Sequence, residues 1–407
     1  MAKTLLTTSN NTSNSSGTDF WPLGITFGSN DRPTEANTQM TYRLAGTLSL
    51  LWCNVTSNTT TAASTLRTRV NGVNGNMSVS IPNATTGEFE DSTNTDAVAS
   101  ADEVNYQLVT GGTGSVNPSV ISSVFDATSN TVVKFAGYAG GGLAISSAST
   151  TQYLTLAGGE MNGLTTEANR QTEINTAGTL KNLFLYISAN TRTTATTFRA
   201  RINGANGNQS ISVAGSSSGI FEDTVNTDTI AANDLVNSLW TTGTGIGTLT
   251  LYLIALDLET TNSKFSFASG DALSLAQGTT RFLSIGGGME TPFSVSGYAV
   301  DMNIGATLSN FVIYISANSL DVTATFDVLV NNAASVLTLS ILTGQTGRFE
   351  DTDSVTVVST DEVEYKSVAP SGTGSLVFNS ISLLCENTEG GVAAAQIHSN
   401  LLLMGVG

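Results

Sequence analysis

Charged side chains are scarce in this sequence, and most of them are acidic. Only 12% of the 407 residues are charged, with 15 basic residues against 32 acidic ones and a formal net charge of −17. Binding to a nucleic-acid backbone needs a positive patch, and the sequence contains no run of Lys or Arg. We therefore expect no nucleic-acid partner, and an acidic surface that favours solubility.

Cysteine and histidine are almost absent, which argues against several kinds of site. Cys53 and Cys385 lie far apart in apolar runs, so we expect two buried free thiols and no disulfide framework. His398 is the single histidine, and one imidazole without a cysteine cluster does not predict zinc. A Ser-His-Asp arrangement would need a nucleophile and orienting partners that the sequence does not identify. We expect no enzyme, no catalytic residue and no bound cofactor.

Long apolar runs are also missing. No stretch approaches the ~20 residues of a membrane-spanning helix, so we expect no membrane partner. The opening, MAKTLLTTSNNTSNSSGTD, has a two-leucine patch where a secretory signal needs about 7 to 15 apolar residues. We expect assembly in a cytoplasm, or export by a route that the sequence does not reveal. The Ser/Asn-rich residues 1–18 predict a flexible N-terminal arm that becomes ordered against a neighbour.

Three copies of one domain are present. Phe89, Phe221 and Phe349 each begin an FED tripeptide, at separations of 132 and 128 residues, and several other motifs recur at the same offsets. Repeats at a fixed offset indicate repeated structural units. Apolar stretches that end in glycines, such as YLTLAGG and FLSIGGG, mark the boundaries between the copies. They place the three domains at 19–152, 153–281 and 282–407.

Each copy has the pattern of short β-strands. Apolar residues alternate along segments such as NLFLYIS and TFRARIN, and Asn203–Gly204 between two such runs predicts a tight hairpin. We interpret the glycine strings GYAGGGLA and GTGIG as turns. Helical periodicity is not seen, and about eight strands fit in each copy. The fold class is therefore all-β, with three tandem antiparallel β-sandwich or jelly-roll domains of one repeated type.

The acidic FED stretch is the strongest candidate site. One interpretation is calcium, with Glu90, Asp91, Asp96 and Asp102 as oxygen ligands. The alternative is a structural corner that fixes a bend between strands. There, the phenylalanines pack inward and the aspartates accept backbone N–H groups. EF-hand spacing is missing and the third copy is one residue shorter, so we favour the corner. Its residues are Phe89, Asp91, Phe221, Asp223, Phe349 and Asp351.

Two arginine pairs lie two residues apart, and therefore on one face of a strand. They are Arg67 with Arg69 and Arg199 with Arg201; the third copy has Asp327 and Leu329 instead. These arginines have two interpretations: they bind an acidic partner or a glycan, or they pair with carboxylates across the sheet. Their loss from the third copy favours pairing within the sheet, or a role confined to two of the domains.

The combined pattern resembles tandem jelly-roll modules in surface proteins of tailed bacteriophages. The motifs concerned are GTL-x-N-L-x-Y-I-S-A-N, R-x-N-G-x-x-G-N and G-x-F-E-D. The pattern is more loosely similar to C1q/TNF-like jelly rolls of bacterial surface fibres. The resemblance implies a non-enzymatic virion protein: a capsid decoration or cement protein, a head fibre or a tail appendage. It also implies a homotrimer that contacts a major capsid protein and assembles in the host cytoplasm.

A second function class stays open. The chain would then be an extracellular filament or adhesin subunit of a bacterium or archaeon, with a host surface glycan as a candidate partner. Glycan binding usually uses aromatic platforms, and Trp21, Trp52 and Trp240 are the only tryptophans.

Overall fold

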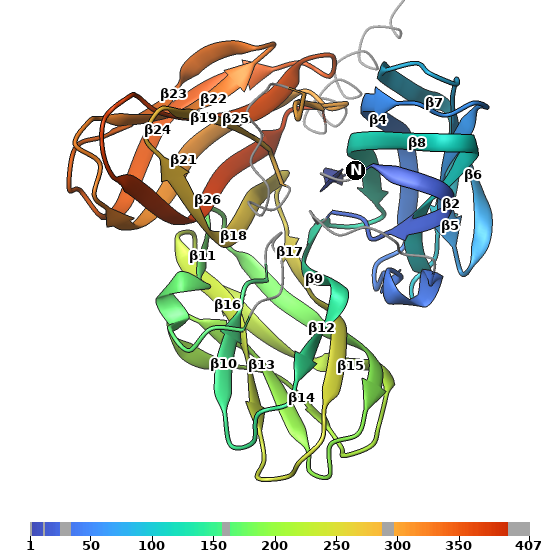
Figure 1. Cartoon of the computed structure of the whole chain (residues 1–407). Helices are drawn as coiled ribbons and strands as arrows, with labels where there is room; N and C mark the ends of the chain where they lie inside the picture. The colour runs from blue at the N-terminus through green and yellow to red at the C-terminus, as the bar shows by residue number, and fades with distance from the viewer. Residues whose placement is uncertain (1, 11–12, 25–33, 157–162, 287–296, 390–407) are drawn as a thin grey trace, which may run out of the picture.

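Three β-sandwiches make up the described part of the chain. The computed structural model describes residues 2–10, 13–24, 34–156, 163–286 and 297–389. The three sandwiches form the three lobes of the molecule and meet at its centre (Figure 1). The helices in these residues are two short 3₁₀ turns, η1 (Glu35–Asn37) and η2 (Glu167–Asn169). The prediction of an all-β fold of several antiparallel sandwich domains is confirmed.

The third sandwich shows the topology most plainly. One sheet has the order β18-β26-β21-β24 and the other β19-β25-β22-β23, with β20 beside β25. Leaving out β20, the first strand along the chain pairs with the last, and the second with the last but one. This wrapped order is that of a jelly roll. The strands are β18 (Lys264–Ala276), β19 (Thr279–Ser284), β20 (Val300–Asp301), β21 (Ala306–Asn318), β22 (Ala324–Val330), β23 (Ala333–Ile341), β24 (Gly347–Val357), β25 (Glu362–Ala369) and β26 (Ser375–Asn387).

The second sandwich repeats this plan. Its sheets have the orders β9-β17-β12-β15 and β10-β16-β13-β14, with β11 beside β16. Its strands are β9 (Thr131–Ile145), β10 (Thr151–Leu154), β11 (Thr172–Ile174), β12 (Gly178–Asn190), β13 (Thr196–Ile202), β14 (Ala205–Val213), β15 (Gly219–Ile230), β16 (Asp234–Thr242) and β17 (Leu249–Thr260). The predicted hairpin at Asn203–Gly204 joins β13 to β14.

The first sandwich differs in one respect, because a single strand, β8, runs through both sheets. Its first half pairs with β2 and β5, and its second half pairs with β1 and β4. Its strands are β1 (Ala2–Ser9), β2 (Asn14–Trp21), β3 (Met40–Thr41), β4 (Gly46–Asn58), β5 (Ser64–Val70), β6 (Val73–Ile81), β7 (Gly87–Val98) and β8 (Glu103–Ala127).

The predicted flexible arm over residues 1–18 is wrong for its described residues, 2–10 and 13–18. Strand β1 pairs with β8 along its whole length, and β2 pairs with the other half of β8. Thr4, Thr7 and Thr8 are buried, and the Thr7 hydroxyl donates to the carbonyl of Ile285 in the third sandwich (2.8 Å). The polar composition here reflects hydrogen bonding at a contact between sandwiches, and not disorder.

The two internal boundaries also lie further upstream than predicted. The sequence placed them at 152/153 and 281/282, but β9 pairs with β17, and β18 pairs with β26. The second and third sandwiches therefore each begin one strand earlier. The glycine string GYAGGGLA, predicted to be a turn, lies inside β9, where the register shifts opposite Leu251 and Leu253. GTGIG does lie in a loop, between β16 and β17.

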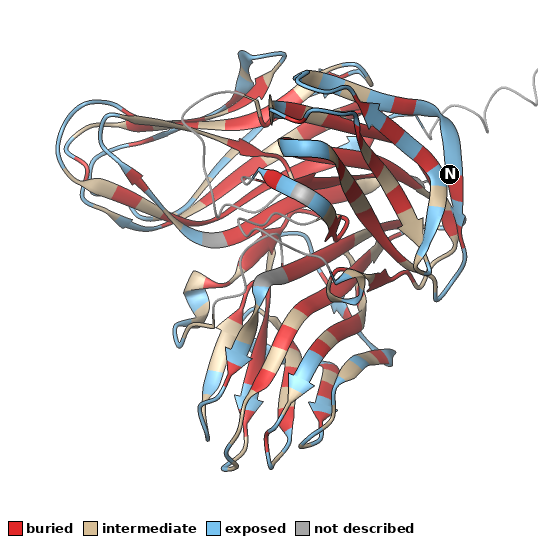
Figure 2. Cartoon of the chain, turned by 45° about the vertical axis from the view of Figure 1, so that its right-hand side comes forward, coloured by how far each residue is buried: buried red, intermediate tan, exposed pale blue. Residues whose placement is uncertain are grey.

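Each sandwich has its own apolar core, and buried positions run along the inner faces of its strands (Figure 2). Cys53 and Cys385 are buried and free, as predicted. Burial of apolar side chains is the main favourable term in folding. Each core also includes side chains from a neighbouring sandwich, so the three lobes are packed against one another.

The equivalent strands β1, β9 and β18 meet at the centre of the molecule. Strand β9 contacts β1 and β18, and β1 contacts β26. The same three strands line a cavity of about 30 Å³ at their meeting point. This volume accommodates one or two water molecules. Equivalent strands around a common centre give the single chain a pseudo-threefold arrangement.

Candidate functional site

The FED stretches lie inside strands β7, β15 and β24, so the predicted bend between strands is wrong. Leu50, Asn182 and Asn310, on the neighbouring strands, have φ values of 55°, 58° and 50°. Each faces the additional residues that follow the FED aspartate, and the register shifts there in all three sandwiches. An extra unpaired residue in one strand is a β-bulge, which bends the strand and increases its twist.

The FED aspartates accept the backbone N–H groups of these bulges. Asp91 accepts from Thr93 (3.3 Å) and Asn94 (3.1 Å), and also from Ser78 on β6 (2.8 Å). Burial alone would raise the pKa of Asp91, but these hydrogen bonds outweigh it and lower the pKa to about 2. Asp223 and Asp351 accept backbone N–H groups in the same way, from Ser210, Val225 and Asn226 and from Thr338 and Asp353 respectively.

The FED phenylalanines are half-buried. Phe89, Phe221 and Phe349 each pack against the core of a sandwich. Phenylalanine and aspartate together therefore connect the bulge to the sandwich: the ring contacts the core and the carboxylate binds the bulge backbone.

The proposed calcium ligands are spread over different contacts. Asp96 accepts the backbone N–H groups of Asn76 and Met77, and Asp102 accepts that of Ala99 and the amide of Asn71. Among the described residues, no group of three or more His, Cys, Asp or Glu side chains is positioned to hold a metal ion. Calcium binding at these corners, the less favoured interpretation, stays untested.

The second arginine of each pair does bind a carboxylate, but not across the sheet. Arg69 forms a bidentate ion pair with Glu35 of η1, with N···O distances of 2.8 and 2.9 Å. Arg201 forms the equivalent pair with Glu167 of η2, with both distances 2.8 Å. These pairs hold a 3₁₀ turn against a sheet. Leu329 takes the arginine's position in the third sandwich.

Contacts between sandwiches are the arrangement that sequence reasoning missed. We call them the 1–2, 2–3 and 3–1 joints, after the sandwiches they join. In the 1–2 joint, Phe184 and Leu253 of the second sandwich join the core of the first. In the 3–1 joint, the equivalent Trp52 and Val120 of the first sandwich join the core of the third. Head-to-tail contacts of this kind produce a ring when the last member meets the first.

Two ion pairs lie at the 1–2 joint, one near the surface and one buried. Nearer the surface, Arg43 forms an ion pair with Glu222, the FED glutamate of the second sandwich, and its Nε lies 3.0 Å from Oε1. Deeper, the buried Lys134 and Asp257 of the second sandwich lie 2.6 Å apart, and Lys134 also lies over the ring of Tyr42. The pKa of Tyr42 is raised, and burial is the largest cause.

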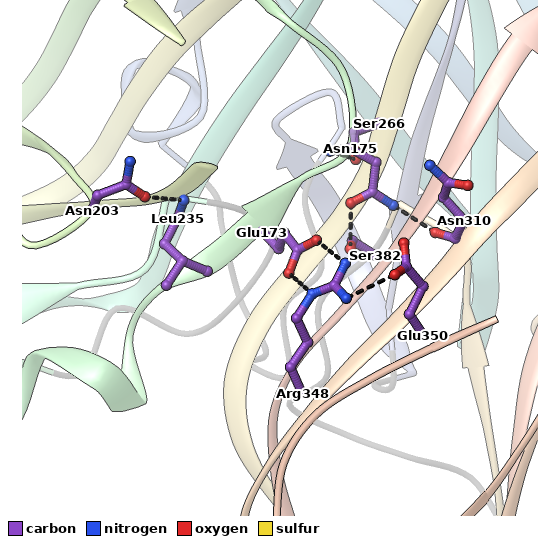
Figure 3. A network of polar contacts seen from close by, with 9 residues as sticks. All are labelled: Glu173, Asn175, Asn203, Leu235, Ser266, Asn310, Arg348, Glu350 and Ser382. Carbon is purple, nitrogen blue, oxygen red and sulfur yellow. Dashed lines mark hydrogen bonds and ion pairs between the residues drawn. The ribbon is translucent and has the colours of Figure 1, made fainter. Parts of the chain in front are cut away.

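The 2–3 joint has the most extensive polar network (Figure 3). Arg348 donates to both carboxylate oxygens of Glu173 at 2.7 Å and to Glu350 at 2.8 Å. Beside it, the Asn175 amide donates to the carbonyl of Asn310 (2.6 Å) and accepts from the hydroxyl of Ser382 (3.0 Å). The hydrogen bonds to Glu173 and Glu350 raise the pKa of Arg348, and the bond to Glu173 is the largest cause.

The 3–1 joint places carboxylates on both sides. At the positions of Glu173 and Arg348 it has Asp301 and Glu88. Burial raises the pKa of Asp301, and repulsion from Glu88 and Glu90 adds to the increase. Direct contacts across this joint include hydrogen bonds from Asn54 and Ser119 to the carbonyl of Gly297 (3.3 and 3.0 Å).

A weak signal for the joints was present in the sequence. Equivalent positions 41, 173 and 301 hold Thr, Glu and Asp, whereas positions 88, 220 and 348 hold Glu, Ile and Arg. Charge changes among copies of one domain mark positions that serve something other than the shared framework. His398 lies outside the described residues. In the described part of the chain, no helix is both long and apolar enough to cross a membrane.

Comparisons with known proteins identify no family. No family model matches the chain, and no curated protein matches it. Among solved structures, the chain is similar to one from the atomic structure of Sulfolobus Turreted Icosahedral Virus, with 12% sequence identity and a TM-score of 0.20. The match covers 92% of this chain and 90% of that one. A TM-score this low carries no argument about function.

Proposed function

We propose that this chain is a non-enzymatic structural protein of a virion surface that acts through protein–protein assembly. The observation that carries the proposal is the pseudo-threefold ring, in which three jelly rolls of one chain meet through equivalent elements. Of the polar groups that the sequence singled out, the FED aspartates bind bulges, and Arg69 and Arg201 hold 3₁₀ turns. Arg43, Glu173 and Arg348 join one sandwich to the next. Such contacts fix the positions of the sandwiches relative to one another.

The ring supports a single chain as the assembly unit. A resemblance to phage jelly rolls implies a homotrimer, and that oligomeric state stays a prediction. Three linked sandwiches supply the geometry of a trimer within one chain, because every lobe presents the same edges around the centre. A partner that repeats around a threefold position, such as a major capsid protein, matches this geometry.

Among virion roles, we favour capsid decoration or cement over a head fibre or tail appendage. The sandwiches are packed side by side around a centre and are not stacked along a shaft (Figure 1). A ring-shaped body suits a flat contact with a shell. Its packed β-domains also suit a particle that must resist unfolding for long periods outside a host.

The test is to find the chain in its native location. Particles from a producing culture are purified by density gradient and analysed by mass spectrometry beside the host surface fraction. The proposal predicts peptides of this chain in the particle band, in a constant ratio to capsid protein. Recovery only from the host surface fraction, without capsid or tail proteins, would overturn the proposal in favour of a filament or adhesin subunit.

The non-enzymatic part is tested separately. Purified chain is incubated with host polysaccharide, and the release of reducing ends is measured. No release above that from a heat-denatured sample is the expected result. Hydrolysis that depends on the folded chain would overturn this part of the proposal while leaving the location open.

A further inference from the structure

The three joints of the ring differ in how the chain crosses them. The chain passes from the first sandwich to the second at residues 128–130, and from the second to the third at residues 261–263. Both links are short, so they hold the adjoining sandwiches close together whether or not the joint between them is formed. The described chain makes no such direct link between the third sandwich and the first. Non-covalent contacts therefore decide whether the 3–1 joint is closed.

The joints also differ in charge at equivalent positions. Arg43 supplies the cation of the 1–2 joint, and Arg348 supplies that of the 2–3 joint. The equivalents of these two arginines in the 3–1 joint are Asn303 and Glu88. Glu88 belongs to β7 of the first sandwich, and its neighbours across the joint are Asp301 on β20 and Glu362 on β25. At these equivalent positions, like charges meet in the 3–1 joint, whereas each of the other two joints has an arginine paired with a carboxylate.

The charged groups around these carboxylates do not neutralise them. From the first sandwich, Glu88 and Glu90 face Asp301, and from the third, Asp361 adds to the repulsion. On β25, Glu364 faces Glu362 and has Lys366 beside it. Lys3 of the first sandwich forms an ion pair across this joint with Glu389 of the third, at 2.9 Å. This pair favours the closed form, but Lys3 is thereby engaged away from Glu88, Asp301 and Glu362.

We propose that the 3–1 joint is the seam of the ring: it opens reversibly while the other two joints stay closed, and acid closes it. The apolar contacts of Trp52 and the hydrogen bonds to Gly297 favour the closed form. Repulsion among Glu88, Asp301 and Glu362 opposes it when all three are ionised. Such a seam lets one chain close around a partner, or adapt its curvature to a shell, in response to proton concentration.

The direction of the pH effect follows from the carboxyl groups. Burial, a hydrogen bond to Glu88 and repulsion from its acidic neighbours raise the pKa of Glu362 to about 7. Burial also raises the pKa of Asp301. A carboxyl whose pKa is higher in the closed form binds a proton on closing. The contribution of Asp301 and Glu362 to closure is therefore complete below the ordinary carboxyl pKa of about 4 and is progressively lost as pH rises to about 7. Burial opposes the shift, but Lys3 lowers the pKa of Glu389 across the same joint, so that ion pair acts in the opposite direction, and only below about pH 4.

The test measures distances across two joints of the full chain. Thr86, Ser218 and Thr346 are exposed and precede β7, β15 and β24 at equivalent positions. Cysteines at Thr86 and Thr346 report the 3–1 joint by fluorescence energy transfer, and cysteines at Ser218 and Thr346 report the 2–3 joint. The native thiols of Cys53 and Cys385 are buried and do not compete for the dye.

Between pH 5 and pH 8, the closed-to-open ratio of the 3–1 pair is expected to fall by at least about tenfold, which corresponds to one pKa unit. The 2–3 pair is expected to stay constant. Glu88→Arg places opposite Asp301 the charge that Arg348 places opposite Glu173, so it is expected to remove the pH response. Asp353→Arg, at an exposed position of β24, makes the same change in net charge and is expected to leave the response intact.

Two results would overturn the seam. One is a 3–1 distance that does not change with pH, and the other is an equal change across both joints. Glu88→Gln serves as a milder variant if Glu88→Arg does not fold, and it is expected to weaken the response. An unaltered pH response in the folded variants would also overturn the proposal, because the charge at position 88 would then not control the joint.

Discussion

Arg348 on β24 and Glu173 on β11 lie 175 positions apart in the sequence and form a two-pronged ion pair across the 2–3 joint. Glu173 is buried, whereas the Arg348 side chain is 37% exposed. The pair therefore matters most through the buried carboxylate, which is left without its cation when Arg348 is removed.

Arg348→Met is expected to lower the free energy of unfolding by about 2 kcal/mol, because it leaves Glu173 buried and unpaired. Arg348→Met combined with Glu173→Gln is expected to cost less than the sum of the two single changes. Urea denaturation followed by tryptophan fluorescence checks this. Glu350→Gln, which removes only the half-exposed partner, is the control and is expected to cost under about 1 kcal/mol. Additive single effects would contradict the pairing.

The FED aspartate is expected to be the least replaceable acid of each sandwich. Asp223→Ala leaves the N–H groups of Val225 and Asn226 without their acceptor, at a cost of about 2 to 4 kcal/mol. Asp223→Asn keeps one acceptor oxygen and is expected to cost less. Thermal unfolding measures both variants. Added calcium or a chelator is expected to leave the wild-type midpoint unchanged, and a calcium-dependent midpoint would support the metal interpretation instead.

Acid is expected to weaken the bulges. The pKa of Asp91 is lowered to about 2 and that of Asp223 is also lowered, so each carboxylate contributes stability above the ordinary pKa of about 4. That stability is lost as pH falls from about 4 towards 2. Comparing wild type with Asp91→Asn in acid denaturation checks the sign: the variant loses less stability over this range. A steeper acid dependence in the variant would contradict it.

The buried ion pair of Lys134 and Asp257 can be replaced by the apolar pair that the first sandwich has at the equivalent place. Strand pairing puts Leu5 opposite Val124 at the equivalent place in the first sandwich. Lys134→Leu alone is expected to cost about 3 to 5 kcal/mol, because Asp257 stays buried without its cation. Lys134→Leu with Asp257→Val is expected to recover most of this loss in urea denaturation. A double variant as unstable as the single one would argue against the pair as the cause.

Arg192 is fully buried, and its guanidinium donates to five backbone carbonyls around the GTGIG loop, at 3.0 to 3.4 Å. The equivalent positions hold Thr60 and Leu320. Arg192→Leu is expected to cost about 2 to 4 kcal/mol, because the buried carbonyls lose their donors. Hydrogen exchange is expected to speed up at residues 243–247, and not in the corresponding loop at 371–375. Unchanged exchange at 243–247 would contradict this role.

Local patterns predicted the strands well, because alternation and Asn-Gly turns act over a few residues. The hairpin at Asn203–Gly204 is an example. The same reasoning failed for β1, whose buried threonines have the composition of a disordered arm and are ordered by a distant sandwich. It also placed the FED bend between strands, since the bulge depends on Asn182 in a strand that is separate in sequence.

The joints were beyond local reasoning for a related reason. Arg43 and Glu222 lie 179 positions apart, and nothing in either segment names the other as its partner. Three copies of one domain also hide the joints, because the shared framework dominates the pattern. The informative positions were those where the copies disagree in charge, such as Glu88 and Arg348.

Electron microscopy of purified native particles that contain this chain tests the central claim most directly. The account predicts three-lobed density with pseudo-threefold symmetry, in which one chain supplies all three lobes and the β1, β9 and β18 strands meet at the centre. Density that places the three sandwiches in a line, or that builds each three-lobed unit from three chains, would contradict it.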